Sequence, residues 1–266
     1  MDARFPSSAS PAGPSAFDAH AARYAEVWGQ DPVAQAQRDV VWEALEAALA
    51  PGSRVLDGGC GIGLDARWLL DHGHAVVGLD SSRGMLAEAR ARAPQAELRL
   101  GALDDPAVLA GLGSFDAAIL DFGVINCLDP ARAARVLAGA LRPGAPLVVV
   151  TMPRVNPTWT LSALAHGRPR AALGRLAREV EVPVEGGWVS TRYLGAGDVA
   201  RAMSPWFTLE DRAGLGFLLP PPGTRWPAAR LARLARLEHR LRRLPLLRAM
   251  GDHLLLLLRR AASEQG

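Results

Sequence analysis

The sequence predicts an α/β fold with a doubly wound parallel sheet, and three observations support this prediction. Short apolar runs alternate with helical patterns from about residue 53 to residue 151. Residues 55–63, VLDGGCGIG, are an apolar run that ends in an acid and a glycine-rich turn. Seventeen residues after Gly63, a second apolar run ends in Asp80. Two strands that each end in a carboxylate, with a glycine turn after the first, indicate a nucleotide pocket at the carboxyl edge of the sheet.

Length, composition and charge bound the possibilities. The 266 residues suffice for one large α/β domain or for a domain with a substantial insertion. All thirty basic residues are arginine, which we attribute to GC-rich codon use, and a formal charge of +3 is too small to indicate nucleic-acid binding. The two cysteines give no disulfide framework. Without a secretion signal or an apolar run long enough for a membrane, we expect a soluble cytoplasmic protein with no integral membrane association.

The N-terminal part is predicted to be a short tail followed by helices. Residues 1–15 are rich in Pro, Ser and Ala, and we expect them to be disordered. Residues 16–50 form an N-terminal helical cover, with one helical pattern at 17–28 and a second that starts at Asp31-Pro32 and runs to about Leu49.

The central part, residues 51–153, is the nucleotide-binding core. Its alternating elements imply right-handed crossovers and helices on both faces of the sheet. The expected strands are residues 53–58, 75–80, 96–100, 115–121 and 146–151. The expected helices are residues 64–72, 82–93, 105–111 and 130–141.

The pattern changes after Pro153. Residues 154–194 contain aromatic residues and arginines without an alternating unit, and they predict a helical or mixed insertion after the fifth strand. Residues 195–262 complete the same domain with a helix at 195–204 and strands at 206–212 and 253–259. Between those strands, a leucine stripe predicts a helix over 228–248. We expect its leucines to pack on the sheet, in preference to a membrane surface, and Pro245 to end its regular part.

The glycine turn alone leaves two cofactor classes open. Residues 61–66 fit the dinucleotide pattern G-x-G-x-x-A, with Asp80 near the ~20-residue spacing of its ribose acid. However, Asp57 precedes the glycines, and a carboxylate there disfavours a pyrophosphate and favours a cationic ligand with an amino group. Glycines in the turn let the backbone approach either ligand closely.

Four segments together resemble one family. They are residues 55–69 (VLDGGCGIGLDARWL), 76–90 (VVGLDSSRGMLAEAR), 115–122 (FDAAILDF) and 141–150 (LRPGAPLVVV). In this order and at these spacings, over about residues 53–152, the chain resembles the class I S-adenosylmethionine-dependent methyltransferases.

The resemblance implies a Rossmann-like, doubly wound, mostly parallel seven-stranded sheet with strand order 3-2-1-4-5-7-6 and an antiparallel last strand. It implies S-adenosyl-L-methionine as cofactor and transfer of a methyl group to a small-molecule acceptor by in-line displacement. An NAD-type oxidoreductase and a non-catalytic S-adenosylmethionine-binding protein are the alternatives. No metal or nucleic-acid partner is expected, since the pair His72 and His74 is better interpreted as surface residues, and the oligomeric state is left open.

The resemblance also assigns cofactor contacts. Asp57 and the turn should face the methionine part of the cofactor, and Asp80 should accept hydrogen bonds from the ribose hydroxyls. Met85 could pack on the adenine or in the core, and Cys60 should be a small packing residue, not a nucleophile. The expected cofactor-binding residues are Tyr24, Asp57, Gly59, Cys60, Gly61, Gly63, Asp80, Ser81, Met85, Ala102, Leu103, Asp104, Asp121 and Phe122.

Adenine recognition departs from the family's pattern. Ala102 stands where the family often has an acid, so the contact falls to the backbone near Ala102-Leu103 or to Asp104. The simpler interpretation of Asp104 is an N-cap of the helix that Pro106 begins.

The acceptor side is less determined. Asp121, at the end of the fourth strand, is a candidate catalytic acid that steers the substrate or accepts its proton; the alternative is a strand-terminal acid exposed to water. His166 is the candidate base, although a loop histidine is more often solvated. Aromatic residues outside the core suit a largely apolar acceptor. The expected substrate-binding residues are Phe17, Asn126, Trp159, Trp188 and Tyr193.

Overall fold

The computed structural model describes residues 15–262 except 176, 178 and 186. The expectation of disorder over residues 1–15 therefore falls almost wholly outside the described residues. The helices are α1 (Ala21–Trp28), α2 (Pro32–Ala48), α3 (Leu64–Asp71), α4 (Arg83–Arg92), α5 (Val124–Cys127), α6 (Pro130–Ala140), α7 (Pro157–Ala165), α8 (Pro169–Gly174), α9 (Ala196–Met203) and α10 (Ala228–Leu241). The strands are β1 (Arg54–Gly58), β2 (Ala75–Asp80), β3 (Glu97–Leu100), β4 (Ala117–Leu120), β5 (Pro146–Thr151), β6 (Glu179–Val184), β7 (Gly187–Arg192), β8 (Phe207–Leu215) and β9 (His253–Arg260).

Seven of these strands form one sheet in the order β3-β2-β1-β4-β5-β9-β8. The pairs from β3 to β5 are parallel, whereas β9 runs antiparallel to both β5 and β8. The hairpin of β6 and β7 forms a separate two-stranded sheet within the insertion. Numbered without this hairpin, the order is 3-2-1-4-5-7-6, so the Rossmann-like sheet with an antiparallel last strand is confirmed.

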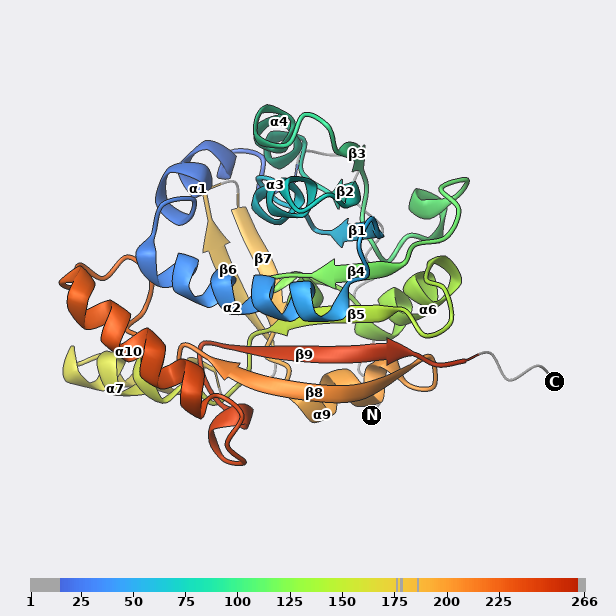
Figure 1. The fold of residues 1–266 in the computed structure, drawn as a ribbon. Helices are drawn as coiled ribbons and strands as arrows, with labels where there is room; N and C mark the ends of the chain where they lie inside the picture. Colours follow the sequence, from blue (N-terminus) through green and yellow to red (C-terminus); the bar gives the residue numbers. More distant parts are fainter. Residues whose placement is uncertain (1–14, 176, 178, 186, 263–266) are drawn as a thin grey trace, which may run out of the picture.

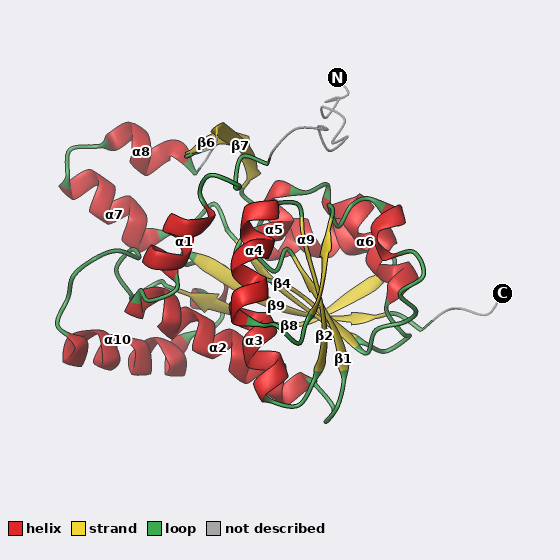
Figure 2. Ribbon diagram, turned by 90° about the horizontal axis from the view of Figure 1, so that it is seen from above, coloured by secondary structure: helices red, strands yellow, loops and turns green. Residues whose placement is uncertain are grey.

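Both faces of the sheet are apolar and covered by helices, as a parallel sheet requires. Neighbouring residues of one strand face opposite sides: Val55 packs with α2 and α3 on one face, and Leu56 belongs to the core beneath α6 and α9 on the other. Figure 2 shows these two helical layers on either side of the fan of strands. The carboxyl ends of the parallel strands all lie at the edge near α1 and the β6–β7 hairpin (Figure 1).

Local chemistry sets the helix starts. Asp31 caps α2, since its Oδ1 accepts hydrogen bonds from the backbone amides of Val33 and Ala34, both at 2.9 Å, and Pro32 occupies the first turn. The prediction that Asp104 caps the helix at Pro106 is wrong. Asp105 caps that short 3₁₀ helix (Pro106–Leu109), because its Oδ1 accepts the Ala107 amide at 3.0 Å.

Two further expectations need correction. The first helix begins at Ala21, after a turn over residues 17–20. The leucine-striped helix ends at Leu241, before Pro245, and its buried Leu231 packs with Val33 of α2 instead of on the sheet. None of the described helices is both long and apolar enough to cross a membrane.

Candidate cofactor and acceptor site

The glycine turn between β1 and α3 is held to the end of the neighbouring strand. The backbone amides of Gly59 and Cys60 donate to the Leu79 carbonyl at 2.6 and 2.9 Å. Gly61 has φ +51°, and a Cβ built there would meet no atom within 4 Å, so the turn is open on that side. A Cβ built at Gly63 (φ +78°) would lie 3.0 Å from the backbone of α4. A glycine is therefore needed there because the turn packs closely against that helix.

Asp80 closes the same turn from the end of β2. Its Oδ2 accepts the Gly61 amide at 2.9 Å and its Oδ1 accepts the Ser82 amide at 2.8 Å. Burial raises the pKa of Asp80, and no ion pair to it is found among the described residues. Each carboxylate oxygen keeps a second lone pair, so the group remains able to accept hydrogen bonds from ribose hydroxyls.

Asp57, at the end of β1, is 1% exposed, and its Oδ2 has no hydrogen-bond partner in the described part of the chain. Burial raises the pKa of Asp57 well above its ordinary value, and the charge of Asp65 raises it further. A buried carboxylate oxygen without a donor beside an open glycine turn fits a ligand that brings its own cationic donor.

Arg38 of α2 joins two more buried carboxylates. Its Nη1 lies 3.0 Å from Asp121 Oδ2 and also contacts Asp65, whose other oxygen accepts the Trp42 indole N–H at 2.8 Å. Burial alone would raise the pKa of Asp65, but the charge of Arg38 lowers it. Burial and the neighbouring Asp65 together raise the pKa of Asp121. Asp121 is therefore a buried, ion-paired group, and the alternative of a strand-terminal acid exposed to water is wrong.

The N-terminal segment covers this side of the site. Phe17 and Tyr24 pack with the buried Ile62 of the turn and Met85 of α4. Asp18 ties the segment to α4, because its Oδ1 accepts the Ser82 hydroxyl at 2.6 Å and the Gly84 amide at 3.0 Å. Phe17, expected on the acceptor side, thus lies among the cofactor-side residues, and Met85 lies in a small apolar cluster.

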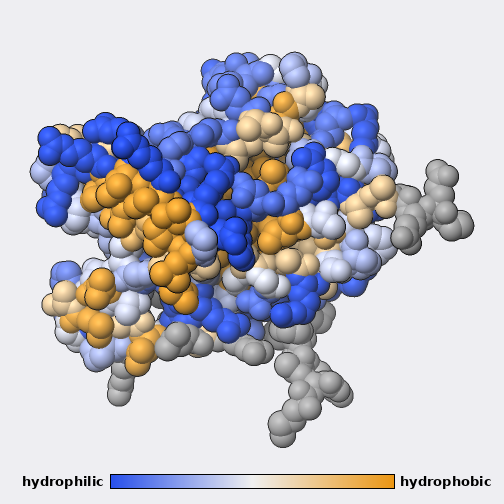
Figure 3. Space-filling view, turned by 60° about the horizontal axis from the view of Figure 1, so that its bottom comes forward, coloured by the Kyte–Doolittle hydropathy of each residue, from blue (hydrophilic) through white to orange (hydrophobic). Residues whose placement is uncertain are grey.

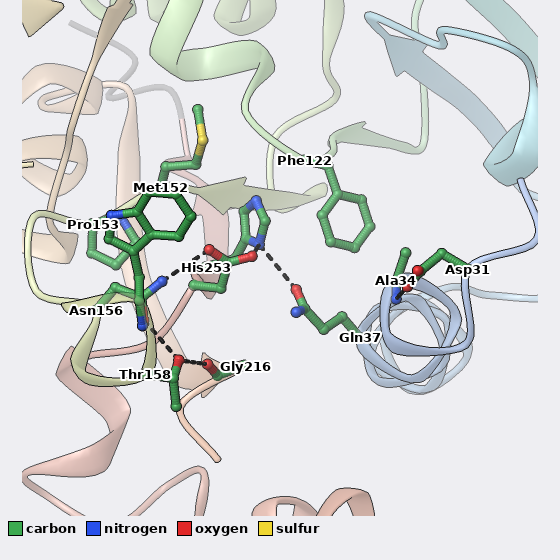
Figure 4. A network of polar contacts seen from close by, with 12 residues as sticks. Asp31, Ala34, Gln37, Phe122, Met152, Pro153, Asn156, Thr158, Gly216 and His253 are labelled. Carbon is green, nitrogen blue, oxygen red and sulfur yellow. Dashed lines mark hydrogen bonds and ion pairs between the residues drawn. The ribbon is translucent and has the colours of Figure 1, made fainter. Parts of the chain in front are cut away.

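A polar network lies on the other side of Phe122, at the start of β9 (Figure 4). His253 Nδ1 is 3.0 Å from Gln37 Oε1 and 3.4 Å from Asp252 Oδ2, and the Phe122 ring meets the imidazole edge-on at 5.0 Å. Asn156 Nδ2 donates to Asp252 Oδ1 at 3.0 Å. Burial lowers the pKa of His253 below its ordinary value of 6.5, so the ring is neutral at neutral pH.

Figure 4 shows the His253 ring beside Phe122, with one nitrogen turned toward Gln37. If Nδ1 carries the proton and donates to Gln37 Oε1, the second ring nitrogen, Nε2, is an acceptor on the side away from Gln37. Arg38 connects the two halves of the site, because its guanidinium also stacks over the Phe122 ring at 4.6 Å from the centroid.

His166, the base expected from the sequence, has a different environment. It is exposed at the C-terminal end of α7, and its Nδ1 lies 2.8 Å from the Ser162 carbonyl of its own helix. Its predicted catalytic role gains no support from these contacts. His253 was missed because the sequence around it, GDHLLLLLRR, shows only a strand start.

Among the expected substrate contacts, Asn126 is fully engaged elsewhere. Its side chain donates to the Met152 carbonyl at 3.2 Å and to the Arg192 carbonyl, and it accepts the Met152 amide at 2.9 Å. It therefore fastens the end of β5 to β7. Trp188 is 66% exposed on the hairpin.

Tyr193 and Trp159 lie nearer the polar network. The Arg175 guanidinium stacks over the Tyr193 ring at 5.2 Å and also lies 2.8 Å from Asp252. The Trp159 amide donates to Asn156 Oδ1 at 2.9 Å.

The residues expected beside the adenine follow β3. Leu103 is buried and lies next to Gly58, Ala102 is half-buried, and Asp104 is 3% exposed. Cys60 is buried and burial raises the pKa of its thiol, which agrees with a packing role. No cluster of metal-ligating side chains is found among the described residues.

Comparisons with known proteins show what the chain is similar to. Residues 55–144 match the family described as methyltransferase domain. The demethylmenaquinone methyltransferase of Renibacterium salmoninarum is 37% identical over 112 residues, which cover 42% of this chain and 46% of that protein. The ubiquinone biosynthesis O-methyltransferase of Xanthomonas axonopodis is 30% identical over 153 residues, 56% of this chain and 64% of that protein. The chain spans about half the length of the demethylmenaquinone methyltransferases that it matches.

Solved structures extend the likeness to the whole fold. An S-adenosylmethionine-dependent methyltransferase from Mesorhizobium loti has a TM-score of 0.52 and 25% identity, covering 82% of this chain and 97% of that chain. The CcbJ methyltransferase from Streptomyces caelestis has a TM-score of 0.61 at 20% identity, covering 94% and 99%. Fold and turn together define a Rossmann-like nucleotide-binding domain whose acidic glycine turn suits a cationic ligand. Over residues 55–144 the chain matches a methyltransferase domain, and its fold is similar to that of an S-adenosylmethionine-dependent methyltransferase.

Proposed function

We propose that this protein transfers a methyl group from S-adenosyl-L-methionine to a small-molecule acceptor. The observation that carries the proposal is Asp57, a buried carboxylate with an unpaired oxygen behind an open glycine turn. Asp65 and Asp121 share the single positive charge of Arg38, and Arg38 makes no ion pair with Asp57 in the described chain. The site thus has a surplus of negative charge, which a cation would balance.

Two carboxylates have separate tasks in this proposal. Asp57 accepts hydrogen bonds from the cofactor's amino group, and Asp80 accepts them from the ribose. When bound, S-adenosylmethionine supplies a methyl group already activated by a positively charged sulfur. Tyr24 and its apolar neighbours exclude water from the same side. Positioning of this kind can contribute ~7–11 kcal/mol to lowering the barrier.

The acceptor side has a group able to hold a proton. His253 is neutral, its side chain is 13% exposed, and Gln37 and Asp252 fix its orientation through Nδ1. We assign Nε2 as the atom that takes a proton from the acceptor, in place of His166. The Phe122 ring meets that ring edge-on and offers an apolar wall.

The acceptor we propose is an aromatic ring that carries a hydroxyl group. Its ring suits the apolar wall, and its O–H needs a base of the His253 type to become a good nucleophile. The names of the demethylmenaquinone and ubiquinone biosynthesis relatives support a ring of this kind.

The first test is a calorimetric titration with S-adenosylmethionine, S-adenosylhomocysteine and NADH. We expect micromolar binding of the first two and none of NADH; binding of NADH alone would overturn the proposal. Asp80→Ala should weaken S-adenosylmethionine binding by more than ~1.5 kcal/mol, about the cost of a lost charged hydrogen bond. Transfer of a labelled methyl group to a panel of phenols and hydroquinones then tests the acceptor class. Binding without transfer to any acceptor would favour the non-catalytic alternative.

A further inference from the structure

Helix α10 and the turn that follows it concentrate positive charge. Residues 225–248 contain eight arginines and one acid, Glu238, whereas the whole chain has a formal charge of only +3. Glu238 is 5% exposed, and its carboxylate accepts the backbone amides of Gly216 at 2.6 Å and Leu218 at 2.8 Å. The one acid of the segment is therefore turned inward and leaves the outer face uncompensated.

Three arginines occupy that outer face. Arg233, Arg236 and Arg240 are exposed, and none of the described side chains forms an ion pair with them. Their spacing of three and four residues places them on one side of the helix. Their charges are thus directed at the solvent or at a partner.

Exposed leucines lie beside these charges. Leu237 is 46% exposed, and it lies four residues after Arg233 and three before Arg240. Leu244 and Leu246, just beyond the helix, are 48% and 71% exposed. Figure 3 shows apolar atoms next to hydrophilic ones on the side of the molecule where α10 and α7 lie. Apolar side chains gathered in this way mark an interaction surface.

The mixture of arginine and leucine identifies the partner. A helix that lies in the headgroup region of a bilayer buries leucines in the apolar layer and offers arginines to anionic lipids. An RNA partner is disfavoured, because residues 225–248 contain a single aromatic residue, Trp226, and its ring is already stacked with the Arg230 guanidinium at 4.1 Å. We infer that α10 and its following turn bind the surface of a membrane that contains anionic phospholipid.

The proposed membrane-binding surface lies close to the His253 network. Glu238 holds the loop at Gly216, and a Cβ built on Gly216 would lie 2.7 Å from Gln37 and 2.8 Å from Asp252. The membrane-facing helix is therefore one loop away from the His253 network.

Vesicle flotation tests the inference with the full-length protein. Vesicles of phosphatidylcholine with ~30% phosphatidylglycerol should carry the protein upward, pure phosphatidylcholine should not, and ~0.5 M NaCl should release it. The triple variant R233Q/R236Q/R240Q should reduce partitioning by about 100-fold, since each arginine near an anionic surface adds several-fold to binding. Replacing Leu244 and Leu246 with serine should also reduce it.

The matched control removes three exposed arginines elsewhere, in R90Q/R135Q/R201Q, and should float like the wild type. Equal losses in the two triple variants would mean that net charge alone drives binding, and would overturn the inference. So would equal flotation on both kinds of vesicle, or tight binding of a labelled single-stranded RNA that phosphatidylglycerol vesicles do not displace. All variants should bind S-adenosylmethionine normally, which separates this result from the proposed function.

Discussion

Replacing Asp57 by Asn should make the ligand-free protein more stable and the cofactor bind more weakly. The side chain is 1% exposed with Oδ2 unpaired, so its charged form is costly in the folded state. Asparagine has nearly the same shape and carries no charge that burial would penalise. A buried group without a partner costs about 1–3 kcal/mol. At ~2–4 °C per kcal/mol for a chain of this size, the melting temperature at pH 8 should rise by about 2–12 °C.

The pH dependence gives a second signature. Because burial raises the pKa of Asp57, the folded wild type binds this proton more tightly than the unfolded chain. The group's contribution to stability is therefore present at low pH and lost as pH rises through the folded pKa. The difference between variant and wild type should be largest at pH 8 and should disappear near pH 4.

Cofactor affinity should move in the opposite direction. Loss of a hydrogen bond between the carboxylate and the cofactor's amino group costs ~1.5–3 kcal/mol, which corresponds to about 10- to 150-fold weaker binding. Differential scanning fluorimetry and calorimetric titration measure both effects. Asp71→Asn, an exposed acid of the neighbouring helix, is the control and should change either value by less than ~0.5 kcal/mol. An Asp57→Asn variant that binds S-adenosylmethionine like the wild type would refute the placement of the amino group.

Two further predictions concern the rest of the site. Arg38→Met should cost about 3–5 kcal/mol in urea unfolding, because it leaves Asp65 and Asp121 buried without their cation; a loss below ~1 kcal/mol would contradict the ion-pair account. His253→Gln should lower kcat by about 10²–10⁴-fold with the identified acceptor, whereas His166→Gln should leave it nearly unchanged. The wild-type rate should fall as pH drops through the pKa of His253, which burial holds below 6.5. If the His253→Gln variant shows the same fall in rate at low pH as the wild type, His253 is not the base.

The sequence predicted the fold, and it predicted which residues should form the cofactor half of the site. Much of this information is local, because the glycine turn and two of the strand-end acids lie in the stretch from Val55 to Asp80. Parallel strands bring their carboxyl ends to one edge, so Asp57, Asp80 and Asp121 could be placed together without coordinates. A family resemblance over the core supplied the strand order.

The residues around His253 and Arg38 could be placed together only from the tertiary structure. Arg38 and Gln37 lie at the strand ends because α2 crosses the sheet. The angle at which a helix crosses depends on side-chain packing between distant segments, which a short stretch of sequence does not reveal. One feature of the sequence could have indicated that Arg38 is buried. It lies three residues before the buried Val41 and therefore on the apolar side of α2. His253 approaches from 216 residues beyond Gln37, and its role depends on burial, which also sets its pKa. Catalytic geometry of this kind arises from contacts distant in sequence, and these become visible only when the chain is folded.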